Sequence, residues 1–173
     1  VGFGRIGQEV TRRVQAVGMK TIWYDVFDTP HPDAPESEYK SLPDLLADSD
    51  YVSLHTNLDE SSRHLIGAPE LEQMKETAYL INTARGGLID QAALVSALQQ
   101  GQIAGAGLDV LDPEPPAADD PILSLPNALV LPHIGTATEE TRRMMRELAV
   151  ENLLAVLGGG RPPAPVNPEV LER

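Results

Sequence analysis

Short apolar runs alternate with segments of helical periodicity along most of this chain. Val1 and Phe3 lead directly into a turn rich in glycine. The apolar residues that follow are spaced three or four apart: Ile6, Val10, Val14 and Val17. This spacing places side chains on one face of a helix, which Gly18 can end. The first twenty residues therefore predict a strand, a tight turn and an amphipathic helix.

The alternation continues to residue 157. Runs of β-branched, aromatic and aliphatic residues predict strands at 20–24, 51–54, 78–82, 103–110 and 128–131, of which 51–54 is expected to be buried. Capping residues and helical patterns predict helices at 41–48 and 65–74, between Asp90 and Gly101, and over 138–157, where Thr136 to Glu139 match a capping box. Strands that alternate with helices predict an α/β fold with a doubly wound parallel sheet. The proline-rich tail, 162–173, is expected to be extended.

The first turn has the spacing Gly2-x-Gly4-x-x-Gly7 between the predicted strand and helix. This is the context of a dinucleotide fingerprint, in which the glycines allow a tight turn, a close approach of a pyrophosphate and close packing of helix on strand. Asp25 ends the second strand about 20 residues later, where a carboxylate can bind the ribose hydroxyls. The alternative is an aspartate that only forms the turn. The position of Asp25 at the end of the strand favours ribose binding.

Polar residues also follow the later strands, at the edge where open α/β sheets bind ligands. His55-Thr56-Asn57 follows residue 54, and Thr83 to Gly87 follows residue 82. His55 is as compatible with packing or capping as with cofactor contact, whereas His31 and His64 are expected to be exposed and structural, respectively. Arg85 beside two glycines is placed to meet an anion. The small residues of 103–110 indicate that something packs tightly against that strand.

Arg85, Glu114 and His133 form a chemically sensible set at this edge. Reduction of a 2-keto acid needs a cation for the carboxylate and carbonyl, and an acid that delivers a proton as hydride arrives. Histidine titrates in the right range, and a nearby carboxylate favours and orients its protonated form.

Composition narrows the function classes. The net charge of −13, with acids spread along the chain, argues against nucleic acid and anionic membranes as partners. Cysteine is absent, no metal site is predicted, and no apolar run approaches a membrane span. We expect a cytoplasmic protein. The chain opens at Val1 without methionine, so we expect a fragment whose first strand is clipped.

The chain resembles the NAD-binding domain of the D-isomer-specific 2-hydroxyacid dehydrogenases over essentially its whole length. Besides the glycine turn and Asp25, the resemblance is carried by Asn82 to Gly87, Gly107 to Val110, Asp112 to Pro115 and Pro132 to Gly135. Residues 133–138, which begin with His133, and residues 165–168 look most like the glyoxylate/hydroxypyruvate reductases. Asn57 stands where the family usually has proline.

This resemblance implies a Rossmann-type domain at 1–160, a tail at 161–173, and a substrate domain missing from this chain, to which a helix at 138–157 would connect. It implies catalytic roles for Arg85, Glu114 and His133, with Arg85 binding the substrate, His133 as general acid/base and Glu114 as its partner. The cofactor residues that we expect are Gly2, Gly4, Arg5, Ile6, Gly7, Asp25, His55, Thr56, Asn57, Thr83, Ala84, Arg85, Asp109, His133, Gly135 and Thr136.

Within that set, Arg5 and Ile6 would cover the pyrophosphate, while Thr83, Asp109 and Gly135 would lie at the nicotinamide end. The resemblance implies NAD, with NADP disfavoured by Asp25, a small 2-keto or 2-hydroxy acid as substrate, and a homodimer. A non-catalytic NAD-sensing module like the corepressors of this fold, and another family member such as a phosphoglycerate dehydrogenase, stay open as alternatives.

Overall fold

The computed structural model describes residues 1–28 and 33–172 and divides into two compact units, Val1–His133 and Ile134–Arg173. The expected exposed histidine at position 31 and its flanking prolines lie outside the described residues. The expected division into a domain at 1–160 and a tail at 161–173 stays a prediction.

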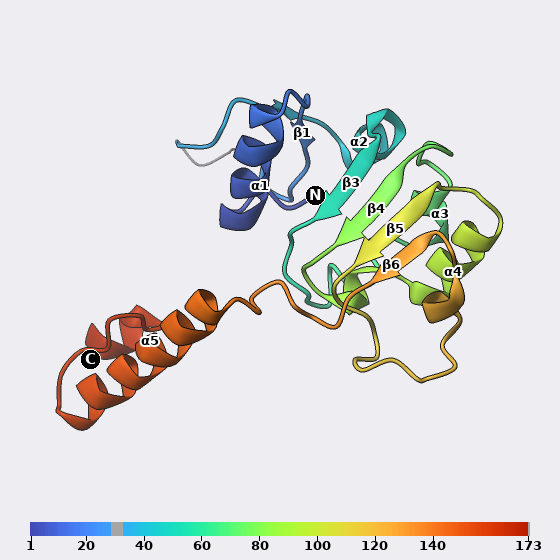
Figure 1. The fold of residues 1–173 in the computed structure, drawn as a ribbon. Coiled ribbons are helices and arrows are strands. Elements are labelled where there is room, and N and C mark those ends of the chain that lie inside the picture. The colour runs from blue at the N-terminus through green and yellow to red at the C-terminus, as the bar shows by residue number, and fades with distance from the viewer. Residues whose placement is uncertain (29–32, 173) are drawn as a thin grey trace. The chain divides into compact units, whose positions relative to one another are not determined.

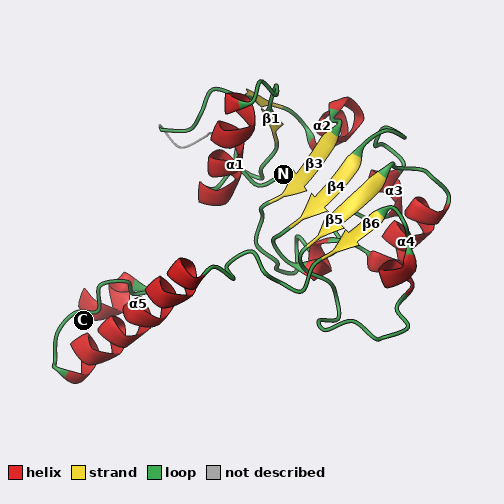
Figure 2. Ribbon diagram, in the orientation of Figure 1, coloured by secondary structure: helices red, strands yellow, loops and turns green. Residues whose placement is uncertain are grey.

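The first unit alternates strands and helices, as the hydrophobic pattern predicts (Figures 1 and 2). Its strands are β1 (Ile22–Trp23), β2 (Glu38–Tyr39), β3 (Tyr51–Leu54), β4 (Tyr79–Asn82), β5 (Gly105–Leu108) and β6 (Ala128–Val130). Its helices are α1 (Arg5–Ala16), α2 (Leu42–Asp48), α3 (Ala68–Leu71) and α4 (Gln91–Gln99), with short 3₁₀ turns at Gly86–Leu88 and Pro121–Ser124. The sequence pattern did not predict β2.

All strand pairs are parallel, in a four-stranded sheet β3-β4-β5-β6 and a two-stranded sheet β1-β2. Residues 1–3 lie between the two sheets. The Gly2 amide donates to the Tyr24 carbonyl (2.8 Å), and the His55 amide donates to the Val1 carbonyl (2.8 Å). The strand order across the unit is therefore β2-β1-(1–3)-β3-β4-β5-β6, which is the doubly wound order with its reversal at residues 1–3.

One face of the four-stranded sheet carries the core. Val52, Leu54, Leu80 and Leu108 are buried there against α2, α3 and α4, which supply Leu45, Leu46, Leu71, Leu94 and Leu98 to the same cluster. The opposite face is open at Tyr51, which is 57% exposed and stacks on Tyr79 with ring centroids 5.6 Å apart. The prediction of a buried strand at 51–54 is therefore correct only for every second residue.

α1 packs on the glycine turn through small and polar side chains. Gly7 and Thr11 are buried, and Gln8 donates from Nε2 to the Phe3 carbonyl (2.8 Å). The predicted apolar stripe is wrong at its ends, because Ile6 is 63% and Val17 78% exposed. Gly18 ends the helix as predicted, with φ of +88°.

An aromatic cluster lies beside the same turn. Phe3 stacks on Trp23 with ring centroids 4.5 Å apart, and Tyr39 meets Trp23 edge-on at 4.9 Å. Trp23 is buried and donates from Nε1 to the Ser37 carbonyl (3.2 Å). The aromatic contacts therefore connect the turn, β1 and β2.

The second unit consists of α5 (Glu139–Leu157) and the tail, which forms a 3₁₀ turn at Pro168–Glu172 rather than a fully extended strand. The helix is capped by Thr138, whose Oγ1 accepts from the Thr141 amide (3.1 Å), so the predicted capping box at Thr136 is displaced by two residues. Asn152 Oδ1 accepts from the Ala164 amide (3.0 Å) and joins the tail to the helix.

Candidate active site

The glycine turn is shaped by two glycines that cannot carry a side chain. A Cβ on Gly2, which has φ of +85°, would lie 2.7 Å from the His55 and Thr56 backbone. A Cβ on Gly7 would lie 2.2 Å from the Gly2 carbonyl oxygen. These contacts let α1 begin directly above the first strand, so that its N-terminus points at the carboxyl edge of the sheet.

Gly4 differs from both, because a Cβ there would meet no protein atom within 4 Å. The residue is the N-cap of α1, and the first helical amide bonded within the turn is that of Gln8, to the Gly4 carbonyl (3.0 Å). The earlier amides of the helix are the free donors that suit an anion. Arg5 and Ile6 are exposed beside them. This open space fits a pyrophosphate at the predicted place.

Asp25 lies at the end of β1 and bends back to the glycine turn. Its Oδ2 accepts from the Phe3 amide (2.7 Å), and Oδ1 makes a long contact with the Phe27 amide (3.4 Å). The carboxylate is therefore held beside Gly2 and Gly4, as a ribose-binding aspartate requires. That Asp25 binds the ribose stays a prediction.

His55 follows β3 and lies beneath the glycine turn. Its Nε2 is 2.9 Å from Ser53 Oγ, and its Nδ1 is buried without a hydrogen-bond partner in the described part of the chain. Burial, followed by the nearby positive charge of the chain's amino group, lowers the pKa of His55 to about 4. The structure thus places His55 as a neutral packing residue of the turn. Thr56 and the exposed Asn57 follow it at the sheet edge.

Asn82 organises the turn that carries Arg85. It is completely buried at the end of β4, its Oδ1 accepts from the Ala84 amide (3.0 Å), and its Nδ2 donates to the Arg85 carbonyl (2.9 Å). No role was predicted for this asparagine. A buried amide at a strand end, just before a turn, was the signal that could have found it.

Gly86 brings the Arg85 turn against the next loop. A Cβ on Gly86 would lie 2.0 Å from the backbone carbon and oxygen of Leu111, so only glycine permits this contact. Leu111 begins the loop that carries Glu114. Arg85 itself is exposed, and its Nη1 donates to the Ala84 carbonyl (2.6 Å). Thr83 is likewise exposed in this turn.

Glu114 and His133 meet directly. Glu114 Oε1 lies 2.8 Å from Nδ1 of His133, and both side chains remain partly open to solvent. The His133 amide donates to the carbonyl of Asp109 (3.0 Å), the buried carboxylate residue at the end of β5. His133 has φ of +52°, a left-handed conformation that costs a non-glycine residue energy. The fold therefore holds this histidine with Nδ1 on the carboxylate and Nε2 available for other chemistry.

Gly135 and Thr136 belong to the second unit, and their cofactor roles stay predictions.

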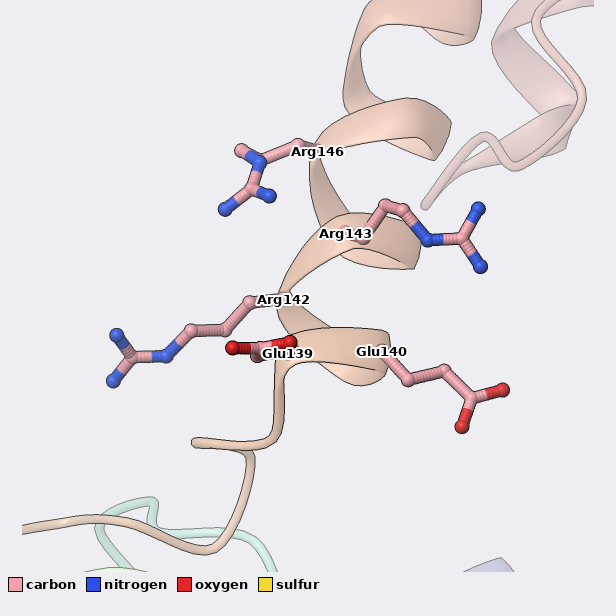
Figure 3. Close-up of a pocket in the computed structure, with 5 residues that line it drawn as sticks. All are labelled: Glu139, Glu140, Arg142, Arg143 and Arg146. Carbon is pink, nitrogen blue, oxygen red and sulfur yellow. The ribbon is translucent and has the colours of Figure 1, made fainter.

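A hollow at the start of α5 is lined only by charged side chains, with Glu139, Arg142 and Arg146 on one side of the helix and Glu140 and Arg143 on the other (Figure 3). Arg143 pairs with Glu147 (3.2 Å), an ordinary exposed helix pair. Among the described residues, no group of His, Cys, Asp and Glu could hold a metal, and no helix could span a bilayer.

A parallel sheet with a Gly-x-Gly-x-x-Gly turn at its reversal point, and a carboxylate held beside that turn, defines a dinucleotide-binding domain of the Rossmann type. The profile described as D-isomer specific 2-hydroxyacid dehydrogenase, NAD binding domain, matches residues 1–135. The chain belongs to this family.

Similar proteins agree with this assignment. A glyoxylate reductase of Korarchaeum cryptofilum is 47% identical over 99% of this chain and 52% of its own length. The NAD-complexed D-isomer specific 2-hydroxyacid dehydrogenase of Lactobacillus delbrueckii ssp. bulgaricus has a TM-score of 0.84 at 39% identity, over 95% of this chain and 54% of that one. An NADPH-dependent glyoxylate/hydroxypyruvate reductase of Sinorhizobium meliloti, in complex with NADP and malonate, has a TM-score of 0.87 at 36% identity, over 95% and 51%. The chain spans about half the length of these proteins.

Proposed function

We propose that this chain is the cofactor-binding and catalytic part of a longer oxidoreductase. The reaction is hydride transfer between NAD(H) and a small 2-keto acid of the glyoxylate or hydroxypyruvate type, which gives the D-2-hydroxy acid. The observation that carries the proposal is the contact of 2.8 Å between Glu114 Oε1 and His133 Nδ1. The similarity to proteins named as glyoxylate and hydroxypyruvate reductases supports the substrate class.

Each side chain has a distinct task in this proposal. The guanidinium of Arg85 binds the substrate carboxylate and polarises the carbonyl. Bound NADH supplies the hydride to the carbonyl carbon. His133 delivers a proton from Nε2 to the carbonyl oxygen, and Glu114 on Nδ1 keeps the ring oriented and favours its charged form. In the reverse direction, neutral His133 takes the hydroxyl proton.

The cofactor preference is part of the proposal. Asp25 beside the turn suits the ribose hydroxyls of NAD, and a 2′-phosphate would bring like charges together. Gly2, Gly4 and Gly7 form the pyrophosphate seat, with Arg5 and Ile6 over it. Thr83, Ala84 and Asp109 flank the nicotinamide end.

The remaining partners rest on the family. We propose a substrate domain outside this chain, connected through the helix Glu139–Leu157, a homodimer, and a cytoplasmic location. Closure of the substrate domain excludes water and clamps the keto acid. The non-catalytic sensor and the phosphoglycerate dehydrogenase have no specific observation in their favour.

Steady-state assays of the whole protein on glyoxylate and hydroxypyruvate test the proposal. We expect turnover with NADH, and NADH binding without measurable turnover for the 173-residue chain alone. Tight NADH binding by the whole protein without turnover on any small 2-keto acid would favour the sensor and overturn the enzyme. Robust turnover by the chain alone would remove the two-domain account.

A further inference from the structure

The loop 112–120, which carries Glu114, is held at both ends by one side chain. That side chain belongs to Gln91, the first residue of α4. Its Oε1 accepts from the Asp112 amide (3.3 Å), and its Nε2 donates to Asp120 Oδ2 (2.7 Å). A single glutamine thus joins the first and last residues of the loop.

The amide of Gln91 suits these two contacts because one of its ends donates and the other accepts. The Asp112 backbone offers a donor and the Asp120 carboxylate offers acceptors, so the amide fits in one orientation. The carboxylate is itself fixed, because Asp120 Oδ1 accepts from the amide of Ile122 (3.0 Å), a completely buried residue. Gln91 thereby connects the loop to the core of the unit.

The first residue of the loop is also fixed to the turn that carries Arg85. Gly87 packs closely there, because a Cβ on it would lie 3.1 Å from Asp112 Oδ2. The same carboxylate oxygen accepts from Arg63 Nη1 (3.2 Å). The loop is therefore attached to the segment that carries Arg85, directly at its first residue and through Gln91 at its last.

Between its ends the loop is exposed and stiff. Pro113, Glu114 and Pro115 are exposed, and Pro116 follows them. The three prolines fix φ at their positions, so a shift at either end moves Glu114 instead of being absorbed. Glu114 in turn meets His133, with Oε1 2.8 Å from Nδ1. The position of Glu114 beside the imidazole thus depends on where the ends of the loop are held.

The start of α4 does not need the Gln91 side chain. Asp90 already caps this helix by accepting from the Ala93 amide (3.1 Å). Both polar groups of Gln91 bond to loop residues instead of to the helix. The two contacts therefore serve the loop.

We propose that Gln91 is a positioning residue for proton transfer, an inference that rests on the function proposed above. By joining the ends of loop 112–120 beside the Arg85 turn, it fixes where Glu114 meets Nδ1 of His133. The proton donor and the cation that binds the substrate are thereby kept in one geometry. A catalytic group misplaced by about 1 Å can cost about 10²-fold in rate, so a side chain that touches no reacting atom can still set kcat.

The test uses the whole protein and exchanges donor and acceptor between Gln91 and Asp120. Either Gln91→Glu or Asp120→Asn alone loses the hydrogen bond between these two side chains. The double variant Gln91→Glu/Asp120→Asn restores it in the opposite direction. The new carboxylate accepts from the Asp112 amide and from the new side-chain amide, whose oxygen still accepts from the Ile122 amide.

The matched control is Gln100→Leu, at the other end of the same helix. Gln100 is exposed and donates from Nε2 to Ser96 Oγ (2.7 Å), away from the loop. The measurements are kcat, the KM for NADH, and the nitrogen NMR shifts of the His133 ring. These shifts show which ring nitrogen carries the proton when the ring is neutral.

Each single variant should lower kcat by about tenfold to 10²-fold, with the KM for NADH within about twofold of the parent value. The His133 ring should change from the form protonated on Nδ1 to a mixture of both tautomers. The double variant should restore kcat and the ring signal, and Gln100→Leu should change neither. If Gln91→Glu does not fold, Asp120→Asn and the double variant give the same comparison.

Single variants with the parent kcat and ring signal would overturn the proposal. A loss of kcat that the double variant does not restore would overturn it as well, because the loss would then not come from the joined loop. Glu114→Gln separates this inference from the proposed function. Parent kcat in that variant would contradict the function, whereas the ring signal of the Gln91 variants reports on the loop without any need for turnover.

Discussion

Glu114 reaches His133 across nineteen positions of sequence, with Oε1 2.8 Å from Nδ1. The carboxylate comes from the loop after β5, and the histidine follows β6 in a left-handed conformation at φ of +52°. The His133 amide also donates to the Asp109 carbonyl, which holds the backbone of the histidine in place. The loops after β5 and β6 thus hold one imidazole through its Nδ1, and Nε2 points away from the carboxylate.

Replacement of His133 by asparagine in the whole protein should lower kcat by about 10²–10⁴, the usual worth of a positioned general acid. Asparagine tolerates the left-handed backbone, so the fold should be kept. His64→Asn is the matched control, because His64 is exposed and has a similar φ of 54°. A His133→Asn enzyme within twofold of the parent kcat would remove His133 from proton transfer.

Alanine substitutions at two glycines of the first turn should affect stability and NADH binding differently. Gly7→Ala brings a Cβ to 2.2 Å from the Gly2 oxygen, so the free energy of unfolding should fall by about 1–3 kcal/mol. Gly4→Ala meets no protein atom and should change stability by only about 1 kcal/mol, the scale of an N-cap change.

The same Gly4→Ala chain should bind NADH about tenfold more weakly, equivalent to about 1.4 kcal/mol. Denaturant unfolding and NADH fluorescence titration measure the two effects. Unchanged NADH affinity in Gly4→Ala would show that the open space above Gly4 is not the pyrophosphate seat.

Asp25→Asn should narrow the preference for NADH over NADPH. The amide oxygen can still accept from the Phe3 amide, which Asp25 Oδ2 now does at 2.7 Å, while the negative charge is lost. Like charges in contact cost several kcal/mol, so the ratio of the two dissociation constants should fall by about tenfold or more. A parent protein that already binds NADPH better would refute the placement of Asp25 at the ribose.

Stability of the 173-residue chain should rise with pH between about 4 and 8. Burial lowers the pKa of the Val1 amino group to about 6 and that of His55 to about 4, so the unfolded chain takes up these protons first as pH falls. The amino group contributes to this pH dependence between pH 8 and 6, and His55 contributes between pH 6.5 and 4. Each changes the free energy of unfolding by at most about 1.4 kcal/mol per pH unit. Denaturant titrations at several pH values measure the slopes.

Two modified chains should show which group is responsible for the pH dependence in each range. N-terminal acetylation should flatten the dependence between pH 6 and 8, and His55→Gln should flatten it between 4 and 6.5. An acetylated chain with the same slope as the free chain from pH 6 to 8 would show that the amino group is not buried in solution.

Local chemistry explains which elements could be predicted. Asp90 caps α4 by accepting from the Ala93 amide (3.1 Å), and Asp25 reaches the glycine turn as its spacing indicates. The first signal is local in sequence, and the second rests on the spacing of the dinucleotide fingerprint. The strand Glu38–Tyr39 could not be found that way, because two exposed residues become a strand only through pairing with Ile22 and Trp23.

The predictions for the cap of α5 and the buried face of α1 were wrong because tertiary or local contacts decide between alternatives that the sequence leaves open. Thr136 and Thr138 are overlapping candidates for the cap of α5, and the Thr138–Thr141 contact decides between them (2.8 Å between the hydroxyls). Periodicity placed Ile6 and Val17 on a buried face, but the close Gly7–Gly2 contact turns α1 onto its small residues. In the site, Glu114 and His133 could be paired from chemistry and the family resemblance. The close contact of Gly86 with the Leu111 backbone could not be predicted, because sequence spacing does not show which loops contact each other.

The stacking of Trp23 on Phe3 has a spectroscopic consequence. Trp23 is the only tryptophan of the chain, and Phe3 lies between the first two glycines of the turn. The indole is thereby shielded from water and in van der Waals contact with the loop on which the dinucleotide would rest. The domain thus carries an internal fluorophore, whose emission should respond to the state of that loop without any label.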